Sequence, residues 1–139
     1  QTTVADAFLA ATIAGYVGGL AAELAALDPA AVLELMQSHG GLAAASAFRG
    51  TNAVLSGPAG GLVGMVKVGR AAGHSRLIGF DMGGTSTDVS LYDGAYPRRT
   101  EVRIAGARLQ TPAMDVHTVA AGGGSILRYE DGRFRVGPD

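Results

Sequence analysis

The sequence predicts an α/β protein, with a helix-rich first part followed by a mostly antiparallel β part. Apolar residues recur at helical spacing over residues 9–27, whereas from Arg76 onward the apolar period falls to two, which is typical of strands. The 22 glycines fall in clusters without a fixed period, which favours tight turns and close backbone approaches. We therefore expect helices with short strands over residues 1–75 and β-hairpins over residues 76–139.

The first helix is expected over residues 2–27. Thr2-Thr3 offers an N-cap, Asp6 lies in the first turn, and Asp28-Pro29 ends the helix. Its apolar residues lie three or four positions apart, at Leu9, Ile13, Val17, Leu20, Leu24 and Leu27. A second helix is expected from about Gly60 to Ala72, after a glycine-rich turn over residues 56–61.

Shorter elements are expected elsewhere. Residues 31–37 favour a buried strand over a helical turn, residues 42–49 suggest a short helix or loop, and residues 53–55 a brief strand. Asp93-Gly94 and Asp131-Gly132 predict hairpin turns. The remaining strands are expected over residues 77–80, 88–92, 98–104, 108–110, 116–120, 126–129 and 133–136. The β part should therefore be a series of antiparallel hairpins.

Composition excludes several classes of partner. The 139 residues suffice for one modest domain, and 11 basic against 12 acidic residues leave no basic face for nucleic acid. The absence of cysteine rules out disulfides and is in keeping with a reducing compartment, so a cytoplasmic location is expected. The most apolar stretch, residues 4–27, is interrupted by Asp6, Thr12 and Glu23, so no membrane contact is expected.

The stretch GFDMGGTSTDVS, residues 79–90, has the composition of a phosphate-binding loop between two strands. Gly83 and Gly84 let the backbone turn and approach a ligand closely, so that amide groups can face a phosphate. Thr85, Ser86 and Thr87 add hydroxyl donors beside those amides. The alternative is a plain strand–turn–strand hairpin. The spacing Asp-x-Gly-Gly-Thr-x-Thr-Asp favours the phosphate-binding interpretation.

Carboxylates flank this loop. Asp81 ends a strand and can hold a hydrated Mg²⁺, because magnesium keeps several waters and takes one or two carboxylates. Asp88 can orient the loop hydroxyls or polarise a water. Neither a Walker motif nor a Gly-x-Gly-x-x-Gly fingerprint is present, so a P-loop and a Rossmann site are both excluded.

Two further glycine clusters are weaker candidates. Gly60 and Gly61 lie where a helix begins, which fits either an anion site or a cap with close packing. Gly122, Gly123 and Gly124 follow a strand, and taken alone they suggest only a loop. Elsewhere, His39 is a candidate cleft residue. Asp115 and His117 share one strand face, which suits a polar surface better than a metal pair.

Four ordered motifs resemble those of the hydantoinase A/oxoprolinase family. They are LMQSHGG at residues 35–41, LSGPAGG at 55–61, GFDMGGTSTDVS at 79–90 and HTVAAGGGS at 117–125. The resemblance covers nearly the whole chain and is weakest over the first 28 residues. Residues 103–139 are most similar to the ATP-dependent 5-oxoprolinase members.

This resemblance implies the actin-like ATPase fold shared with sugar kinases and Hsp70. In that fold two phosphate-binding hairpins clamp ATP around Mg²⁺. Residues 81–88 resemble the second hairpin, and the first is absent from this sequence. The chain is therefore expected to be an internal fragment of one actin-like ATPase domain, incomplete as a catalyst by itself.

The activity implied by the resemblance is ATP-driven opening of a cyclic amide such as 5-oxoproline or a hydantoin, a reaction of glutathione metabolism in the first case. The amide carbonyl oxygen would take the γ-phosphoryl group before water opens the ring. Asp81 would anchor Mg²⁺ through water, residues 83–87 would bind phosphate, and Gly60-Gly61 with Gly122–Gly124 would border the cleft. No residue can be named as the hydrolytic base.

Partners and alternatives also follow from the resemblance. The implied partners are a small cyclic amide and a hydantoinase B-type subunit or domain, and a homo-oligomer is possible. One alternative is an acetone carboxylase-type subunit, which activates a carbonyl with ATP. The other is a non-catalytic module that, when isolated, self-associates through surfaces normally covered.

Overall fold

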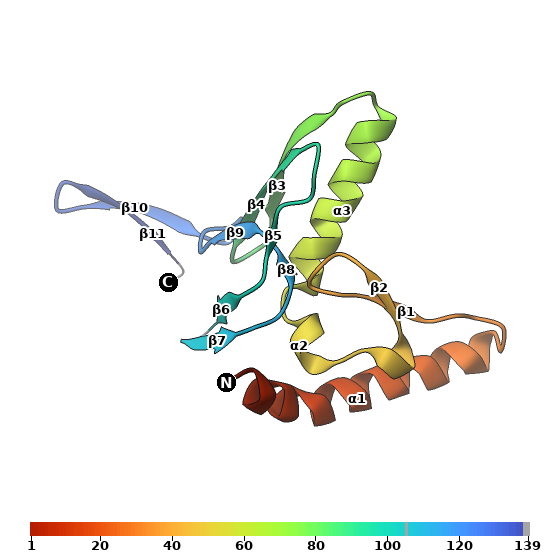
Figure 1. The fold of residues 1–139 in the computed structure, drawn as a ribbon. Helices are drawn as coiled ribbons and strands as arrows, with labels where there is room; N and C mark the ends of the chain where they lie inside the picture. The colour runs from red at the N-terminus through yellow and green to blue at the C-terminus, as the bar shows by residue number, and fades with distance from the viewer. Residues whose placement is uncertain (105, 138–139) are drawn as a thin grey trace. The chain divides into compact units, whose positions relative to one another are not determined.

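The computed structural model describes residues 1–104 and 106–137. They form two compact units, the first from Gln1–Val63 with Pro97–Met114 and the second from Gly64–Tyr96 with the residues after Met114. A long helix comes first and strands predominate in the second half, as the sequence predicts (Figure 1). Every strand pairing described is antiparallel, which confirms the expectation for the β part.

The first unit combines helices with two-stranded pairs. The pairs are β1 with β2, β5 with β8, and β6 with β7. Its elements are α1 (Thr2–Leu27), β1 (Glu34–Met36), β2 (Leu42–Ala44), the 3-10 helix η1 (Ala45–Ala47), α2 (Gly50–Ala53), the start of α3 (Ser56–Ala71), β5 (Arg98–Arg99), β6 (Val102–Ile104), β7 (Ala107–Leu109) and β8 (Ala113–Met114). A small core of Val102, Leu109 and Ala113 packs against partly buried apolar side chains from α1 and from the segment after α2.

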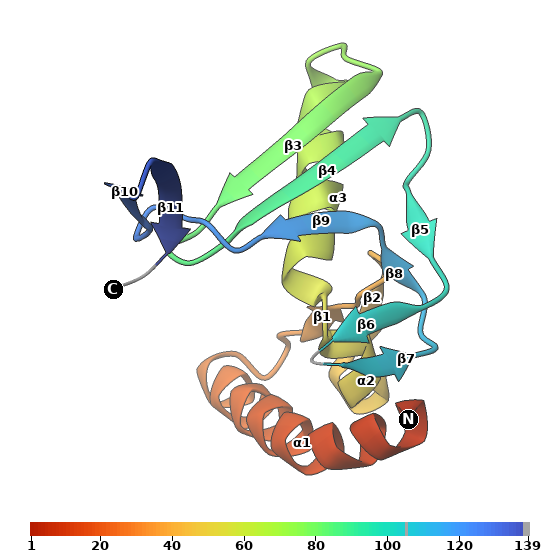
Figure 2. The same ribbon diagram turned by 90° about the vertical axis from the view of Figure 1, so that its left-hand side faces the viewer.

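The second unit contains a three-stranded sheet in the order β3–β4–β9 (Figure 2). Its strands are β3 (Arg76–Met82), β4 (Thr87–Asp93), β9 (Val116–Val119), β10 (Ile126–Glu130) and β11 (Arg133–Gly137). The rest of α3 packs closely on this sheet: a Cβ on Gly69 would lie 2.5 Å from Leu77, and one on Gly79 would lie 2.6 Å from the Met65 sulfur. Glycine at these positions lets helix and sheet approach each other.

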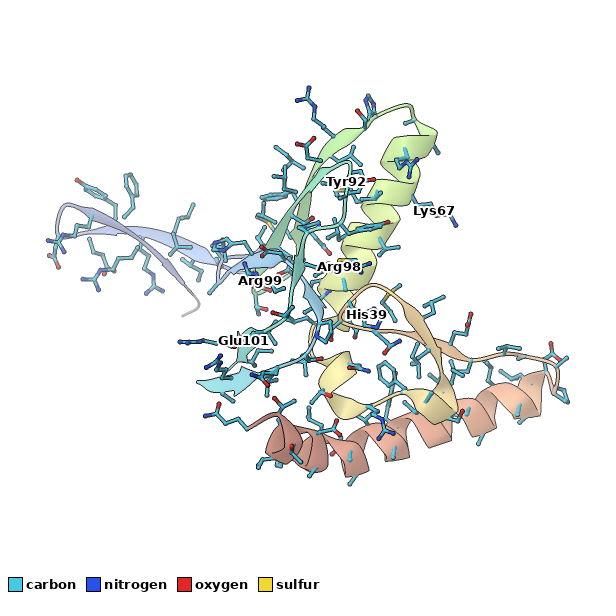
Figure 3. The ribbon with its side chains drawn as sticks, viewed as in Figure 1. His39, Lys67, Tyr92, Arg98, Arg99 and Glu101 are labelled. Atoms are coloured by element: carbon cyan, nitrogen blue, oxygen red, sulfur yellow. The ribbon has the colours of Figure 1, made fainter. Side chains whose placement is uncertain are left out.

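The two Asp-Gly dipeptides behave differently. Asp131 and Gly132 both have positive φ, 52° and 76°, and they close the β10–β11 hairpin as predicted. Gly94 also has a positive φ of 85°, but no hairpin forms there, because β4 pairs with β3 and β9 while β5 pairs with β8. The buried Tyr92 instead holds this turn by donating its hydroxyl to the Gly94 carbonyl at 3.2 Å (Figure 3).

Several local predictions are wrong. Residues 42–44 form a strand, since they pair with β1. Residues 53–55 are not a strand, because Ala53 ends α2 and residues 54–55 form a turn. The single strand expected over 98–104 is split into β5 and β6, which have different partners. Helix α3 begins at Ser56, so residues 56–61 form its first turns and are not a turn that precedes it.

The start of α1 also differs from the prediction. The N-cap position is Gln1, so Thr2 lies inside the helix, and its hydroxyl accepts a hydrogen bond from the Gln110 amide at 2.8 Å. Asp6 lies beyond the first turn. Its carboxylate accepts hydrogen bonds from the amide and the hydroxyl of Thr51, both at 3.1 Å, and so caps the start of α2. Asp6 therefore fastens α2 to α1.

Helix α1 is long and mostly apolar. Among the described helices it is the one long and apolar enough, by length and composition, to cross a membrane, with a mean hydropathy of 1.5 over its best window. That match is weak evidence, because core helices and signal sequences have the same properties. Only Val17 of α1 is buried, so most of its apolar surface is exposed in this structure.

Replacement of Asp6 by alanine should destabilise α2 locally. The Thr51 side chain is 8% exposed, and loss of a capping acceptor costs about 1–2 kcal/mol. Native-state hydrogen exchange of the peptide that contains Thr51 should therefore be faster in Asp6→Ala. Glu23→Ala, which removes an exposed carboxylate from the same helix, should leave that exchange unchanged.

Candidate functional site

The tip of the β3–β4 hairpin consists of residues 83–86. The last strand pair is Met82 with Thr87, and the Gly83 amide then donates to the Ser86 carbonyl at 2.9 Å. Gly83, Gly84 and Thr85 are exposed, as a ligand-binding tip requires. The sequence thus correctly predicts a loop between two strands at this position.

A second glycine-rich turn follows β9. The Gly122 amide donates to the Ser125 hydroxyl and the Ser125 amide donates to the Gly122 carbonyl, both at 2.9 Å. These reciprocal bonds close residues 122–125 into a compact turn. The pairing of Thr87 with Val119 places β9 beside β4, so this turn begins next to the hairpin tip.

The turn and the hairpin tip are in direct backbone contact. The Gly123 amide donates to the Gly83 carbonyl at 2.9 Å, and the Gly124 amide donates to the Gly84 carbonyl at 2.8 Å. A Cβ on Gly122 would lie 2.6 Å from the Gly83 oxygen and 2.7 Å from the Gly84 carbonyl carbon. A side chain therefore does not fit at position 122 unless the tip moves.

Thr87 strengthens the same contact. The residue is 4% exposed, and its hydroxyl donates to the Ala121 carbonyl at 2.6 Å. Because this hydroxyl proton is already donated within the protein, Thr87 ties the second turn to the start of β4. Its hydroxyl differs in this respect from the exposed Thr85 and the half-buried Ser86.

The amides of Gly84, Thr85 and Ser86 have no hydrogen-bond acceptor among the residues that the structure describes. They are consecutive and lie at the end of a hairpin. Consecutive free backbone N–H groups at a turn form a concave site for anions. This arrangement can therefore bind the oxygens of a phosphate or a similar anion.

A row of polar side chains crosses the sheet beside the tip. Asp81 of β3 is paired with Asp88 of β4, and Asp88 is paired with Thr118 of β9, so all three point to one face. The Thr118 hydroxyl donates to the Asp88 carboxylate at 2.6 Å. Two carboxylates directly opposite each other repel, so this row favours a cation between or beside them.

The donor set fits magnesium. No group of three or more His, Cys, Asp or Glu side chains suited to a metal is found within residues 1–104 and 106–137, so a closed protein cage is absent there. Mg²⁺ usually keeps several waters and needs only one or two carboxylates. The exposed Asp81 and the half-buried Asp88 supply that number.

The predicted site residues fall into two sets. Gly60 and Gly61 lie in α3 within the first unit, where a Cβ on Gly60 would make only an ordinary 3.5 Å contact with Met36. The second unit holds the others, namely Asp81, Gly83, Gly84, Thr85, Ser86, Thr87, Asp88, Gly122, Gly123 and Gly124.

Sequence reasoning named residues 122–125 as a candidate loop but missed the roles of Thr118 and Ala121. Their contributions depend on β9 pairing with β4, and no local pattern in the sequence indicates that pairing. His39, a candidate cleft residue, instead accepts a hydrogen bond from the Gly41 amide at 3.2 Å within the β1–β2 turn (Figure 3).

Comparison with known proteins identifies the family. The family model described as hydantoinase/oxoprolinase matches residues 1–139, and the chain belongs to this family. A 5-oxoprolinase from Arabidopsis thaliana is 51% identical over 99% of the chain. An ATP-dependent caprolactamase from Pseudomonas jessenii has a similar structure, with a TM-score of 0.79 and 34% identity over 99% of the chain. A nucleotide-free acetone carboxylase gives a TM-score of 0.65 and 31% identity over 78% of the chain.

These relatives are much longer than the chain. It covers 11% of the Arabidopsis 5-oxoprolinase, 20% of the caprolactamase chain and 16% of the acetone carboxylase chain. The matched segment is therefore a small part of each of these proteins.

Thr87→Val should show how much the Thr87 hydroxyl contributes to stability, because valine keeps the side-chain volume and removes the hydroxyl. It leaves the partly buried Ala121 carbonyl without its donor, and we expect a loss of about 1–2 kcal/mol in unfolding free energy. Thr87→Ser keeps the donor and should lose less than about 1 kcal/mol. Urea denaturation can compare the two, and equal losses would contradict the assigned hydrogen bond.

Proposed function

We propose that this chain provides one of two phosphate-binding hairpins in an ATPase domain with the actin-like fold. The proposal makes residues 1–139 part of one such domain within a longer enzyme. The observation that carries it is the hairpin tip, whose free amides at Gly84, Thr85 and Ser86 lie beside the paired carboxylates of Asp81 and Asp88. An anion and its counter-cation can both be held there.

The residues have separate roles in this proposal. The free amides, with the hydroxyls of Thr85 and Ser86, bind phosphate oxygens, and Asp81 holds Mg²⁺ through water. Bound Mg²⁺ would neutralise phosphate charge. Asp88, held by Thr118, fixes the other side of the carboxylate row or orients a water. Gly60 and Gly61 are proposed to border the nucleotide or the substrate.

The proposed reaction of the longer enzyme is ATP-dependent hydrolysis of a cyclic amide. The amide carbonyl oxygen accepts the γ-phosphoryl group of ATP, and ADP leaves. Water then attacks the ring carbon and the C–N bond breaks, which leaves an acyl phosphate. A second water hydrolyses this acyl phosphate to a carboxylate and free phosphate. Two relatives support this chemistry: one is named a 5-oxoprolinase, and another is an ATP-dependent caprolactamase. The 51% identity to the former favours 5-oxoproline as substrate. A hydantoinase B-type subunit or domain is the proposed partner, and the proposed location is cytoplasmic.

A carboxylase of the acetone carboxylase type is the alternative enzyme. Its support is weaker, because the identity to the acetone carboxylase structure is 31% over a shorter part of the chain. A second alternative concerns the isolated chain, which would self-associate without catalysis. The exposed apolar face of the β3–β4 hairpin favours self-association, since Ile78 is 76%, Phe80 68% and Leu91 60% exposed.

Phosphate release by the complete enzyme distinguishes the cyclic-amide hydrolase from the carboxylase. With Mg·ATP, we expect release to increase on addition of 5-oxoproline and not on addition of acetone with bicarbonate. The 139-residue chain by itself should show no 5-oxoproline-dependent release. Stimulation by acetone and bicarbonate alone would favour the carboxylase.

Asp81→Ala in the complete enzyme should lower ATP hydrolysis by about a hundredfold or more, because the metal loses its protein anchor. Asp93→Ala provides the matched control, since Asp93 is an exposed carboxylate at the other end of β4. It should leave the rate near that of the wild type. Near-normal hydrolysis in Asp81→Ala would reject the proposed Mg²⁺ role.

Thr118 is expected to act through Asp88. Thr118→Val removes the hydroxyl that donates to the Asp88 carboxylate, so we expect about a fivefold to tenfold rise in the Mg²⁺ concentration needed for half-maximal hydrolysis. Thr118→Ser retains the donor and should restore the wild-type requirement. An unchanged requirement in Thr118→Val would show that Asp88 needs no such support.

A further inference from the structure

We infer that the turn formed by Gly122, Gly123, Gly124 and Ser125 is a positioning element, which aims the amides of the hairpin tip at the phosphate. The inference rests on the proposed function. It assigns these glycines a different role from that expected from the sequence, where they border the cleft directly. The turn acts on the ligand through the backbone of Gly83 and Gly84.

The amides of the turn are already used. Gly122 donates to the Ser125 hydroxyl, Gly123 to the Gly83 carbonyl, and Gly124 to the Gly84 carbonyl. None of these three N–H groups is left to bind a phosphate oxygen. Direct binding by the backbone donors of Gly122–Gly124 is therefore inconsistent with the geometry.

Because of peptide geometry, these bonds determine the direction in which the amides of Gly84 and Thr85 point. The described chain has no cis peptide bonds, and in a planar trans peptide the C=O and the next N–H point in opposite directions. The Gly83 carbonyl shares its peptide with the Gly84 amide, and the Gly84 carbonyl shares its peptide with the Thr85 amide. Since both carbonyls point to the turn, the amides of Gly84 and Thr85 point away from it.

The tip needs this restraint because of its own glycines. Gly83 and Gly84 allow close approach of a ligand, but their conformational freedom also permits the peptide planes to rotate. A rotated plane would present a carbonyl oxygen to an anion in place of an N–H group. The bonds from Gly123 and Gly124 oppose that rotation before any ligand binds, which is preorganisation of the site.

Steric contacts explain the glycines at positions 122 and 124 of the turn. A Cβ would lie 2.6 Å from the Gly83 oxygen at position 122 and 2.9 Å from the Gly84 oxygen at position 124. At position 123 the nearest atom, the Gly83 oxygen, would be 3.8 Å away, an ordinary contact. Gly122 is therefore the most sensitive point of the positioning element.

Hydrogen exchange in the complete enzyme tests the inference, with Mg·ATP as the probe. In the wild type, Mg·ATP should slow exchange in the peptide that contains Gly84, Thr85 and Ser86. Gly122→Ala should remove this slowing and weaken Mg·ATP binding by about tenfold or more. Gly64→Ala is the control, because a Cβ there meets no atom within 4 Å, and it should behave as the wild type.

Ser125 provides a second test that does not add a group to the contact. Ser125→Ala removes the acceptor of the Gly122 amide and should weaken Mg·ATP binding by about fivefold, whereas Ser125→Thr keeps a hydroxyl and should bind normally. The comparison of Ser125→Ala with Ser125→Thr tests the positioning role of the turn even if Gly122→Ala does not fold.

The outcomes separate the two proposals. Slowed exchange at the tip in the wild type, with equal slowing and affinity in Gly122→Ala and Ser125→Ala, would overturn the positioning role and leave the phosphate-binding role intact. No slowing at the tip of the wild type at saturating Mg·ATP would overturn the phosphate-binding role and the positioning role with it.

Discussion

The backbone contact between Gly83–Gly84 and Gly122–Gly124 is the constraint on which the candidate site depends. It requires β9 to pair with β4 in the register that sets Val119 beside Thr87, because only then does the turn after β9 reach the tip before β4. Thr87 reinforces that register by bonding to Ala121. Glycine at positions 122 and 124 is therefore a requirement of packing between the two loops.

The same sheet also brings charged side chains together beside the hairpin tip. Strand alternation brings Asp81, Asp88 and Thr118 to one face, close to the free amides of the tip. The amides attract an anion, and the opposed carboxylates attract a cation. A metal–phosphate pair would satisfy both groups together, which is the chemical basis of the nucleotide and metal site proposed above.

Local features were predictable from the sequence, and pairings between distant segments were not. The long helix, the strands on both sides of residues 83–86 and the Asp131-Gly132 hairpin follow from periodicity and turn chemistry, which act over a few residues. The hairpin predicted at Asp93-Gly94 does not form, because an Asp-Gly dipeptide specifies a turn but not the partner of the next strand. The role of Thr118 could not be predicted, since an isolated threonine acquires its role only from the strand beside it.

The separation of the two loops along the chain has a consequence for protein engineering. The segment from β3 to β4 looks self-contained, with two paired strands and a tip that carries the characteristic glycines. The carbonyls of its tip, however, are held by amides 40 positions later in the chain. A hairpin transplanted alone into another scaffold would keep its sequence motif but lose the contacts that orient its amides. The smallest segment to transplant is therefore discontinuous and must include β9 with the turn that follows it.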